Sequence, residues 1–369
     1  MKKRSTRLLS LCLAIVLTAG LLAINGFAAS EKKYGVYTAI GDSIPAGYGL
    51  DGFDTKSHEC WNGGIIADSY PVLLADELDT DVYNSMSRPG FRTVELRALL
   101  DDTYSGDEYT TDMLLPTLQI SAQEFSAYGA ELTEAIKSSD LITLELGSND
   151  IFTYAVMSME AYIAKQQGVD KTELSEARSY MSNFETLDKA FSKLMDMAKK
   201  LNVTAGAVSL FTADMMKGYV NFKINLPKCV KAIYALNPDV ELLVVGMYNP
   251  FRDVKLTDQS LLKIGSAADQ FVGLMNVYMK TLCPYAYKYT YVDVTDAQVY
   301  QFSSVVSGEI PNELLKNVHP TVAGHRYIAD QIIAALPAGT ASNSSSASAA
   351  GVATGAVTAV TRLLGARLR

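Results

Sequence analysis

The chain has 369 residues and a net charge of −8, with acidic and basic residues interspersed along its length. This distribution excludes an extended basic surface, so we expect no nucleic-acid partner. The sequence has no phosphate-binding loop, no paired-glycine nucleotide motif and no Cys/His cluster with zinc-ligand spacing. We therefore expect neither a metal nor an organic cofactor.

The N-terminus has the three-part organisation of a secretory signal peptide. Met1–Arg7 is rich in lysine and arginine, Leu8–Ile24 is apolar, and small residues follow from Ala28 to Ser30. We predict a signal peptide over residues 1–30, cleaved after Ala28 or Ser30. The alternative, an uncleaved membrane anchor, would need a longer apolar run. No later segment has the roughly 18 consecutive apolar residues of a membrane span, so we expect a secreted or cell-surface protein.

Five short apolar runs predict buried strands. Runs such as "LITLEL" and "VELLVVG" lack the alternation of a half-exposed strand. Such runs are typical of a parallel sheet that is covered by helices on both faces. The predicted strands are Gly35–Ile40, Asp81–Ser85, Leu141–Leu146, Val240–Gly246 and Tyr289–Val294.

Helical patterns alternate with these strands. Ser69–Leu78 begins with a serine and Pro71, which suit the first turn of a helix. Apolar residues recur at helical spacing over residues 125–136 and 184–201, and Ala323–Ala335 forms the last helix. The alternation predicts an α/β fold with a three-layer, doubly wound, five-stranded parallel sheet of flavodoxin-like type.

One domain over residues 31–337 accounts for these elements. The stretch at about 151–226 is longer than an ordinary crossover, and we predict a helical insertion there, a candidate cap over the site. Residues 338–369 form a Ser/Ala/Gly-rich tail whose composition favours a flexible linker over a cell-wall sorting signal. Cys60, Cys229 and Cys283 allow either one disulfide and a free thiol or three buried thiols.

Candidate site residues follow three of the predicted strands. Ser43 follows the first strand, Gly90 the second and Asn149 the third. In a doubly wound sheet a site forms beyond the carboxyl ends of the strands, so we expect these three residues to converge on one rim.

Four short motifs carry a resemblance to a known family. They are "GDS" at Gly41–Ser43, "SRPGFRT" around Gly90, "GSND" at Gly147–Asp150 and "VHPTVAGH" around His319. In this order they resemble the blocks of the SGNH (GDSL) hydrolase family, over roughly Tyr34 to Leu336. The resemblance implies that Ser43 is the nucleophile and His319 the base. It also implies an oxyanion hole formed by the Ser43 amide, Gly90 and Asn149.

The chemistry of ester cleavage requires the same residue types. A serine hydroxyl becomes a good nucleophile only when an imidazole takes its proton. The tetrahedral oxyanion needs fixed donors, which Asn149 and the close backbone at Gly90 can supply. Ser43 is not on a G-x-S-x-G nucleophile elbow, because Pro45 occupies the second glycine position. Its alternative role is that of a helix cap.

His319 is the candidate base among three histidines. Pro320 favours an extended or turn conformation at His319, directly before the last helix. His58 lies in a predicted loop, and His325 falls on the last helix, one helical face removed from the rim. Either is a weaker candidate than His319.

At the position of the third member of the catalytic triad, this chain departs from the family pattern. The family usually has an aspartate three residues before the histidine, where this chain has Lys316. Asn317 or Glu313 could orient the histidine, or a backbone carbonyl could do so in a Ser–His dyad. Near the rim, Arg88 and Arg92 are candidates for contact with an anionic substrate, or are simply solvated.

The sequence therefore predicts a secreted serine esterase or lipase that acts through an acyl-enzyme. Its substrate would be a lipid ester, an acylated glycan or a small soluble ester. One alternative is a non-catalytic extracellular glycan-binding protein on the same fold. The other is an anion or nucleotide binder, which would leave Asn149 and His319 unexplained.

Overall fold

The computed structural model of the protein describes residues 34–53, 65–104, 122–181, 205–250, 269–297 and 319–337, together with Ala190, Lys193, Leu194, Asp196, Met197 and Lys200. A compact unit spans Tyr34–Ala335. The predicted signal peptide (1–30) and tail (338–369) lie outside the described residues, as do most of the residues of the predicted helix at 184–201.

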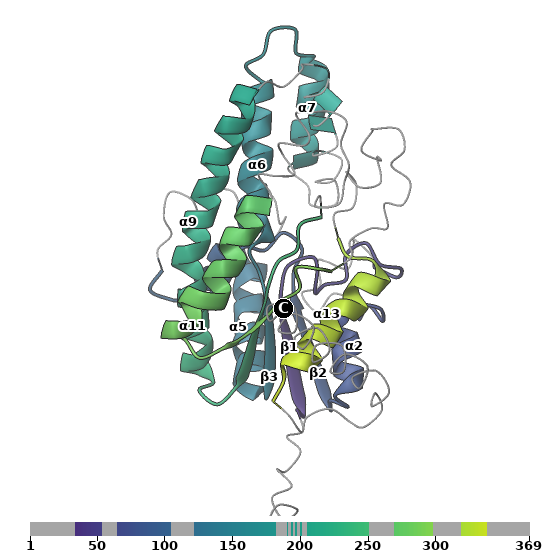
Figure 1. Cartoon of the computed structure of the whole chain (residues 1–369), viewed down its shortest axis with the longest axis vertical. Helices are drawn as coiled ribbons and strands as arrows, with labels where there is room; N and C mark the ends of the chain where they lie inside the picture. Colours follow the sequence, from purple (N-terminus) through teal and green to yellow (C-terminus); the bar gives the residue numbers. More distant parts are fainter. Residues whose placement is uncertain are drawn as a thin grey trace, which may run out of the picture. The chain divides into compact units, whose positions relative to one another are not determined.

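Five parallel strands form one sheet in the order β2-β1-β3-β4-β5 (Figure 1). The prediction of a doubly wound parallel sheet is confirmed, and the predicted strand ends differ from the observed ones by at most two residues. The strands are β1 (Val36–Gly41), β2 (Val82–Ser87), β3 (Leu141–Glu145), β4 (Glu241–Val245) and β5 (Thr290–Val292).

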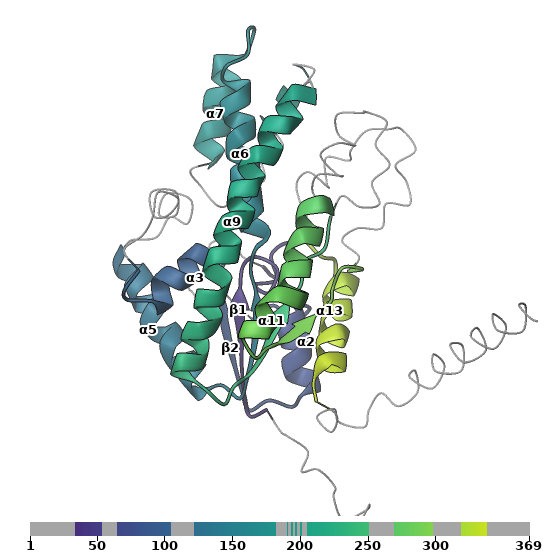
Figure 2. The same cartoon turned by 60° about the vertical axis from the view of Figure 1, so that its left-hand side comes forward.

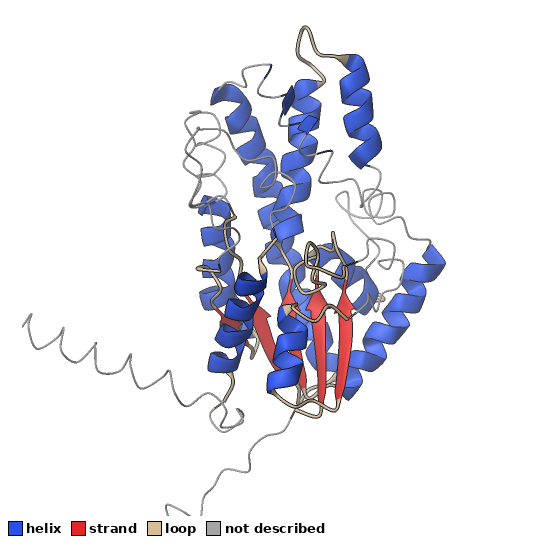
Figure 3. Ribbon diagram, turned by 90° about the vertical axis from the view of Figure 1, so that its right-hand side faces the viewer, coloured by secondary structure: helices blue, strands red, loops and turns tan. Residues whose placement is uncertain are grey.

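The burial of the central strand β3 explains why polar and apolar residues do not alternate in its sequence. All of its residues are buried, because helices cover both faces of the sheet (Figure 3). One face carries α3, α5 and α9, which pack around a core that includes Ile40, Leu144 and Val244. Helices α2 and α13 pack together over the other face. The bounds are α2 (Tyr70–Glu77), α3 (Thr93–Leu100), α5 (Ala122–Ser138), α9 (Ala205–Leu236) and α13 (Val322–Ala335).

The described part of the long connection from β3 to β4 is mainly helical. It contains α6 (Ser148–Ile163), α7 (Lys171–Met181) and α9, and these helices extend beyond the carboxyl ends of the strands (Figures 1 and 2). After β4, residues 269–277 are helical and continue through the π-helical turn η4 (Tyr278–Leu282) into α11 (Cys283–Ala286). Among the described helices, none is long and apolar enough to cross a membrane.

Two of the three cysteines outside the predicted signal peptide lie among the described residues. Cys229 and Cys283 are buried free thiols, so they do not form a disulfide with each other. Cys60 lies outside the described residues.

The crossing of α6 and α9 depends on a glycine. A Cβ atom at Gly218 would lie 2.1 Å from the carbonyl oxygen of Asp150 and 3.0 Å from the ring of Tyr154. Only glycine permits this approach of α9 to the first turn of α6. Because Asn149 precedes Asp150, the crossing also supports the rim of the sheet.

We expect Gly218→Ala to destabilise the protein by about 1–3 kcal/mol, because the new methyl group forces the two helices apart. The measurement is urea denaturation followed by circular dichroism. The matched control is Gly273→Ala in the helix at 269–277, where a Cβ meets no atom within 4 Å. This control should leave stability unchanged or raise it by up to about 1 kcal/mol. Equal effects of the two substitutions would contradict the close crossing.

Candidate functional site

The strand order places a switch point between β1 and β3. The connection from β1 runs through α2 on one face, whereas the connection from β3 runs through α9 on the other. A crevice forms at such a point, beyond the carboxyl ends of the two strands. Ser43 follows β1 and Asn149 follows β3.

A tight turn after β1 presents Ser43. A Cβ at Gly41 would lie 2.4 Å from Pro45 Cγ and 2.6 Å from the carbonyl oxygen of Glu145, so the turn folds back closely on the strand end. The backbone N–H of Ile44 donates to Asp42 Oδ1 at 3.0 Å, as expected for an aspartate in a turn. Residues 43–49 form turns rather than a helix, so Ser43 is not a helix cap.

The loop after β2 is tied to the Ser43 turn and to α6. The N–H of Arg88 donates to the carbonyl of Gly41 at 2.9 Å. Gly90 has φ +84°, a left-handed conformation that favours glycine. The Asp150 carboxyl group accepts from the N–H of Thr93 at 3.0 Å and from its hydroxyl at 2.6 Å, which fixes the start of α3.

Asn149 joins the three loops. Its Nδ2 donates to Asp42 Oδ2 at 3.0 Å and to the carbonyl oxygen of Phe91 at 3.2 Å. These bonds link the loop after β3 to the loops after β1 and β2. The side-chain amide therefore lies at the shared rim of the sheet.

His319 lies against Ser43. Its Nε2 is 2.7 Å from Ser43 Oγ, although the two residues are 276 positions apart in the chain. Both residues are only 8% exposed. The ring of Tyr48 lies 4.6 Å from the imidazole, centroid to centroid. The hydroxyl and the imidazole thus form a shielded, hydrogen-bonded pair.

Burial keeps this imidazole uncharged. Burial, with a smaller contribution from the nearby His325, lowers the pKa of His319 from about 6.5 to about 3. At neutral pH the ring therefore has a lone pair that can accept the serine proton.

The chain matches the model of the GDSL-like lipase/acylhydrolase family over residues 39–327. It belongs to this family. Comparison with curated protein sequences gives no significant match.

Solved structures of similar fold include hydrolases from several bacteria. An extracellular lipase from Streptomyces rimosus is 16% identical with a TM-score of 0.48, and the match covers 82% of this chain and 99% of that one. A phospholipase A1 from Streptomyces albidoflavus NA297 is 16% identical with a TM-score of 0.47, over 82% and 100%. An acetyl-xylooligosaccharide esterase mutant from Geobacillus is 13% identical with a TM-score of 0.36, over 82% and 95%.

Other residues considered in the sequence either differ from the expectation or lie outside the described residues. Arg88 and Arg92 are 2% and 4% exposed, so the expectation that they are solvated is wrong. The guanidinium of Arg92 pairs with Glu95, with Nε donating to Oε1 at 2.9 Å. The proposed orienting residues Asn317 and Glu313 lie outside the described residues, as does His58.

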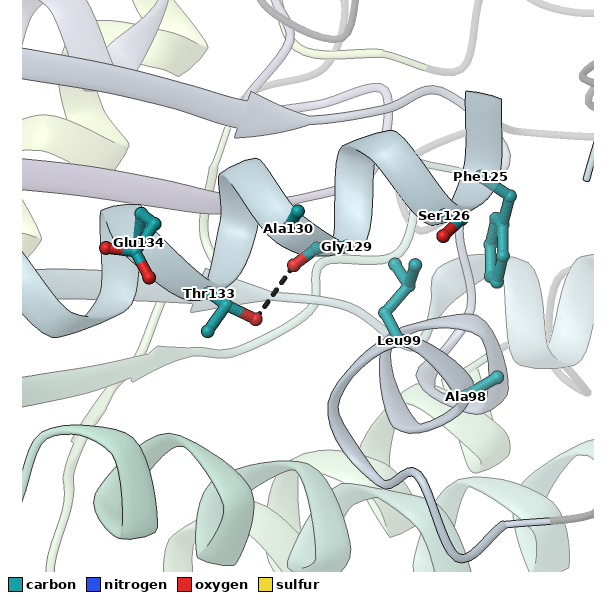
Figure 4. A pocket seen from close by; sticks show the side chains of 8 residues that line it. All are labelled: Ala98, Leu99, Phe125, Ser126, Gly129, Ala130, Thr133 and Glu134. Carbon is teal, nitrogen blue, oxygen red and sulfur yellow. Dashed lines mark hydrogen bonds between the residues drawn. The ribbon is translucent and has the colours of Figure 1, made fainter. Parts of the chain in front are cut away.

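A surface groove lies between α3 and α5, and neither Ser43 nor His319 lines it. It has a volume of about 550 Å³ and contains one titratable side chain, Glu134 (Figure 4). Its lining residues are Ala98, Leu99, Phe125, Ser126, Gly129, Ala130, Thr133 and Glu134. The Thr133 hydroxyl donates to the carbonyl of Gly129 within α5. The groove has no nucleophile and base in contact, so the Ser43–His319 pair remains the candidate site.

The described residues contain no group of three His, Cys, Asp or Glu side chains that could hold a metal ion. The acidic groups near the site are buried carboxyl groups. Burial raises the pKa of Asp42 and of Asp150 to about 7, and the charge of Asp150 adds to the effect on Asp42. Burial likewise raises the pKa of Glu145 well above its ordinary value.

Sequence reasoning missed Glu145, although a signal was present. It is an acidic residue within the apolar run "LITLEL", on a strand that is buried throughout. Its Oε2 has no hydrogen-bond partner among the described residues. Burial of a carboxyl group with one oxygen left unpartnered favours its protonated form.

We expect Glu145→Gln to change the pH dependence of stability. In the wild type the folded state retains a proton that the unfolded state releases above about pH 4.5. The free energy of unfolding therefore falls as pH rises, by at most about 1.4 kcal/mol per pH unit for one proton. Glutamine cannot ionise, so the variant should gain stability relative to the wild type between pH 5 and pH 8 in urea denaturation.

The control for this prediction is Glu134→Gln, at a side chain that is 73% exposed on α5. It should leave the pH dependence unchanged. Parallel stability curves for the wild type and Glu145→Gln would show that Glu145 is ionised in the fold.

Proposed function

We propose that the protein is a secreted serine ester hydrolase that cleaves carboxylic esters through an acyl-enzyme. The observation that carries this proposal is the 2.7 Å separation of Ser43 Oγ and His319 Nε2. Membership of the GDSL-like lipase/acylhydrolase family supports the reaction class. The basic, apolar and small-residue regions of residues 1–30 support secretion.

The reaction has two proton-coupled steps. Ser43 Oγ attacks the ester carbonyl carbon while His319 Nε2 accepts the hydroxyl proton. The tetrahedral intermediate then collapses, and the imidazolium returns the proton to the departing alcohol. A water molecule attacks the acyl-serine, His319 accepts its proton, and the carboxylic acid leaves as Ser43 regains its proton.

The oxyanion is stabilised by three donors: the N–H groups of Ser43 and Gly90 and the side-chain amide of Asn149. Both hydrogens of Asn149 Nδ2 are engaged, one by Asp42 and one by Phe91. The bond to the Phe91 carbonyl is the longer one. We infer that the oxyanion replaces this bond, while Asp42 keeps the amide oriented.

The substrate class follows from the family only as far as the ester bond. A lipid ester, an acylated glycan and a small soluble ester all fit this chemistry. Asn317, Glu313 or a backbone carbonyl would orient His319 through Nδ1. The mechanism requires neither a metal nor an organic cofactor.

A fluorophosphonate probe and nitrophenyl esters test the proposal. We expect the probe to label Ser43, as located by peptide mass spectrometry. Ser43→Ala should abolish labelling, and His319→Ala should lower hydrolysis by at least about 10³-fold, because each removes one half of the reacting pair. An acyl-length series alongside acetylated xylan then identifies the preferred ester. Inertness of the folded wild type towards probe and esters would favour the glycan-binding alternative.

Asn149→Ala tests the oxyanion hole separately. We expect kcat to fall about 100–1000-fold with little change in KM, because the lost donor acts mainly in the transition state. The control is Asn237→Ala. Asn237 Nδ2 donates to the carbonyls of Ile136 and Ser139, which precede β3, so it lies at the amino ends of the strands, away from the site. This substitution should reduce stability and leave kcat unchanged. A normal kcat in Asn149→Ala would exclude Asn149 from the oxyanion hole.

A further inference from the structure

The second histidine of the "VHPTVAGH" motif forms an unexpected contact. His325 lies on α13 and is completely buried. Its Nδ1 accepts a hydrogen bond from the backbone N–H of Tyr70 at 3.2 Å. The rings of the two residues are stacked, with centroids 6.2 Å apart. His325 therefore satisfies one of the free N–H groups at the start of α2.

The bond determines the form of the imidazole. Nδ1 can accept from an N–H group only when it carries no proton, so the ring is neutral and its proton lies on Nε2. Ser69, at the N-cap position of α2, makes no side-chain hydrogen bond to the helix. The acceptor at the start of α2 is instead supplied, to the N–H of Tyr70, by a side chain 255 residues away.

The starts of α2 and α13, joined by this hydrogen bond, adjoin the segments that contain Ser43 and His319 respectively. On α13, the N–H of His325 donates to the carbonyl of Thr321 at 2.8 Å. Thr321 lies two residues after His319. One turn of helix thus connects His325, whose imidazole is bonded to α2, to the segment that contains His319.

On the other side, the residues before α2 pack against the turn that carries Ser43. A Cβ at Gly47 would lie 2.9 Å from Ile66 Cβ and 3.1 Å from Ser69 Cβ. Gly47 is itself bonded to the turn, because its N–H donates to the carbonyl of Ile44 at 2.9 Å. A movement of the start of α2 would therefore move the turn around Ser43.

We propose that His325 is a positioning residue that, by capping α2, holds His319 within hydrogen-bond distance of Ser43. The inference rests on the proposed function, in which proton transfer between these two side chains is essential. An error of about 1 Å in such a pair can lower the rate by roughly 100-fold. His325 itself acts through the backbone and does not touch the reacting atoms.

Three substitutions separate the hydrogen bond from simple packing. In His325→Asn, the side-chain oxygen can take the place of Nδ1 and accept from the N–H of Tyr70. In His325→Gln, the amide extends to the position of Nε2, and His325→Leu fills the space without an acceptor. We expect kcat for nitrophenyl acetate to fall about 10–100-fold in the Gln and Leu variants, with KM within about twofold. The Asn variant should stay within about threefold of the wild type.

A second measurement follows the position of His319 without using activity. The chain has three histidines, so the imidazole NMR signals of histidine-labelled protein can be assigned. The His319 signals should shift in the Gln and Leu variants and stay at their wild-type positions in the Asn variant. If the Leu variant does not fold, the Asn and Gln variants make the same comparison between two polar side chains.

The outcomes distinguish the two proposals. Unchanged His319 signals and wild-type kcat in the Gln variant would overturn the positioning role, as would equal impairment of the Asn and Gln variants. If the wild type hydrolyses no ester and binds no fluorophosphonate, the proposed function fails. The His319 signals then still decide whether His325 sets the position of that ring.

Discussion

The hydrogen bond between Ser43 and His319 is the constraint on which the site depends. It joins residues 276 positions apart, so neither side chain can be placed by local structure alone. The parallel sheet brings the ends of β1 and β3 together at a switch point, and with them Ser43 and Asn149. His319 directly precedes α13, which packs on the face opposite α9, and its imidazole lies at the same rim. The rest of the fold can be understood as support for this one contact.

Local rules were sufficient for the sheet and for the positions of the motif residues. Runs such as "LITLEL" identify buried strands, and the residue after each strand end must lie at the carboxyl rim. Ser43, Gly90 and Asn149 could therefore be located relative to the strands, although their proposed roles come from the family resemblance. Pro320 marked the start of the last helix and hence the approach of His319.

The contacts between distant segments could not be predicted in this way. Whether Arg92 is solvated or buried depends on Glu95, which lies one helical turn further on and folds back against it. The bond from Tyr70 to His325 needs two helices from opposite ends of the domain to meet. Motif spacing contains no information about either packing. Glu145 was the exception, since an acidic residue in a buried strand is already unusual within the sequence itself.

The buried ionisable groups share one property that suits the proposed chemistry. Burial lowers the pKa values of His319 and His325 and raises those of Asp42, Glu145 and Asp150, so in all five it shifts the equilibrium towards the uncharged form. A neutral His319 can accept the serine proton, and a neutral His325 can cap α2. With a pKa of about 7, Asp42 is partly protonated at neutral pH, and in that form it places no negative charge beside the position where an oxyanion would develop. An ionised Asp42 would orient Asn149 more firmly but would oppose that charge. Burial of Asp42 therefore balances orientation of the amide against stabilisation of the oxyanion.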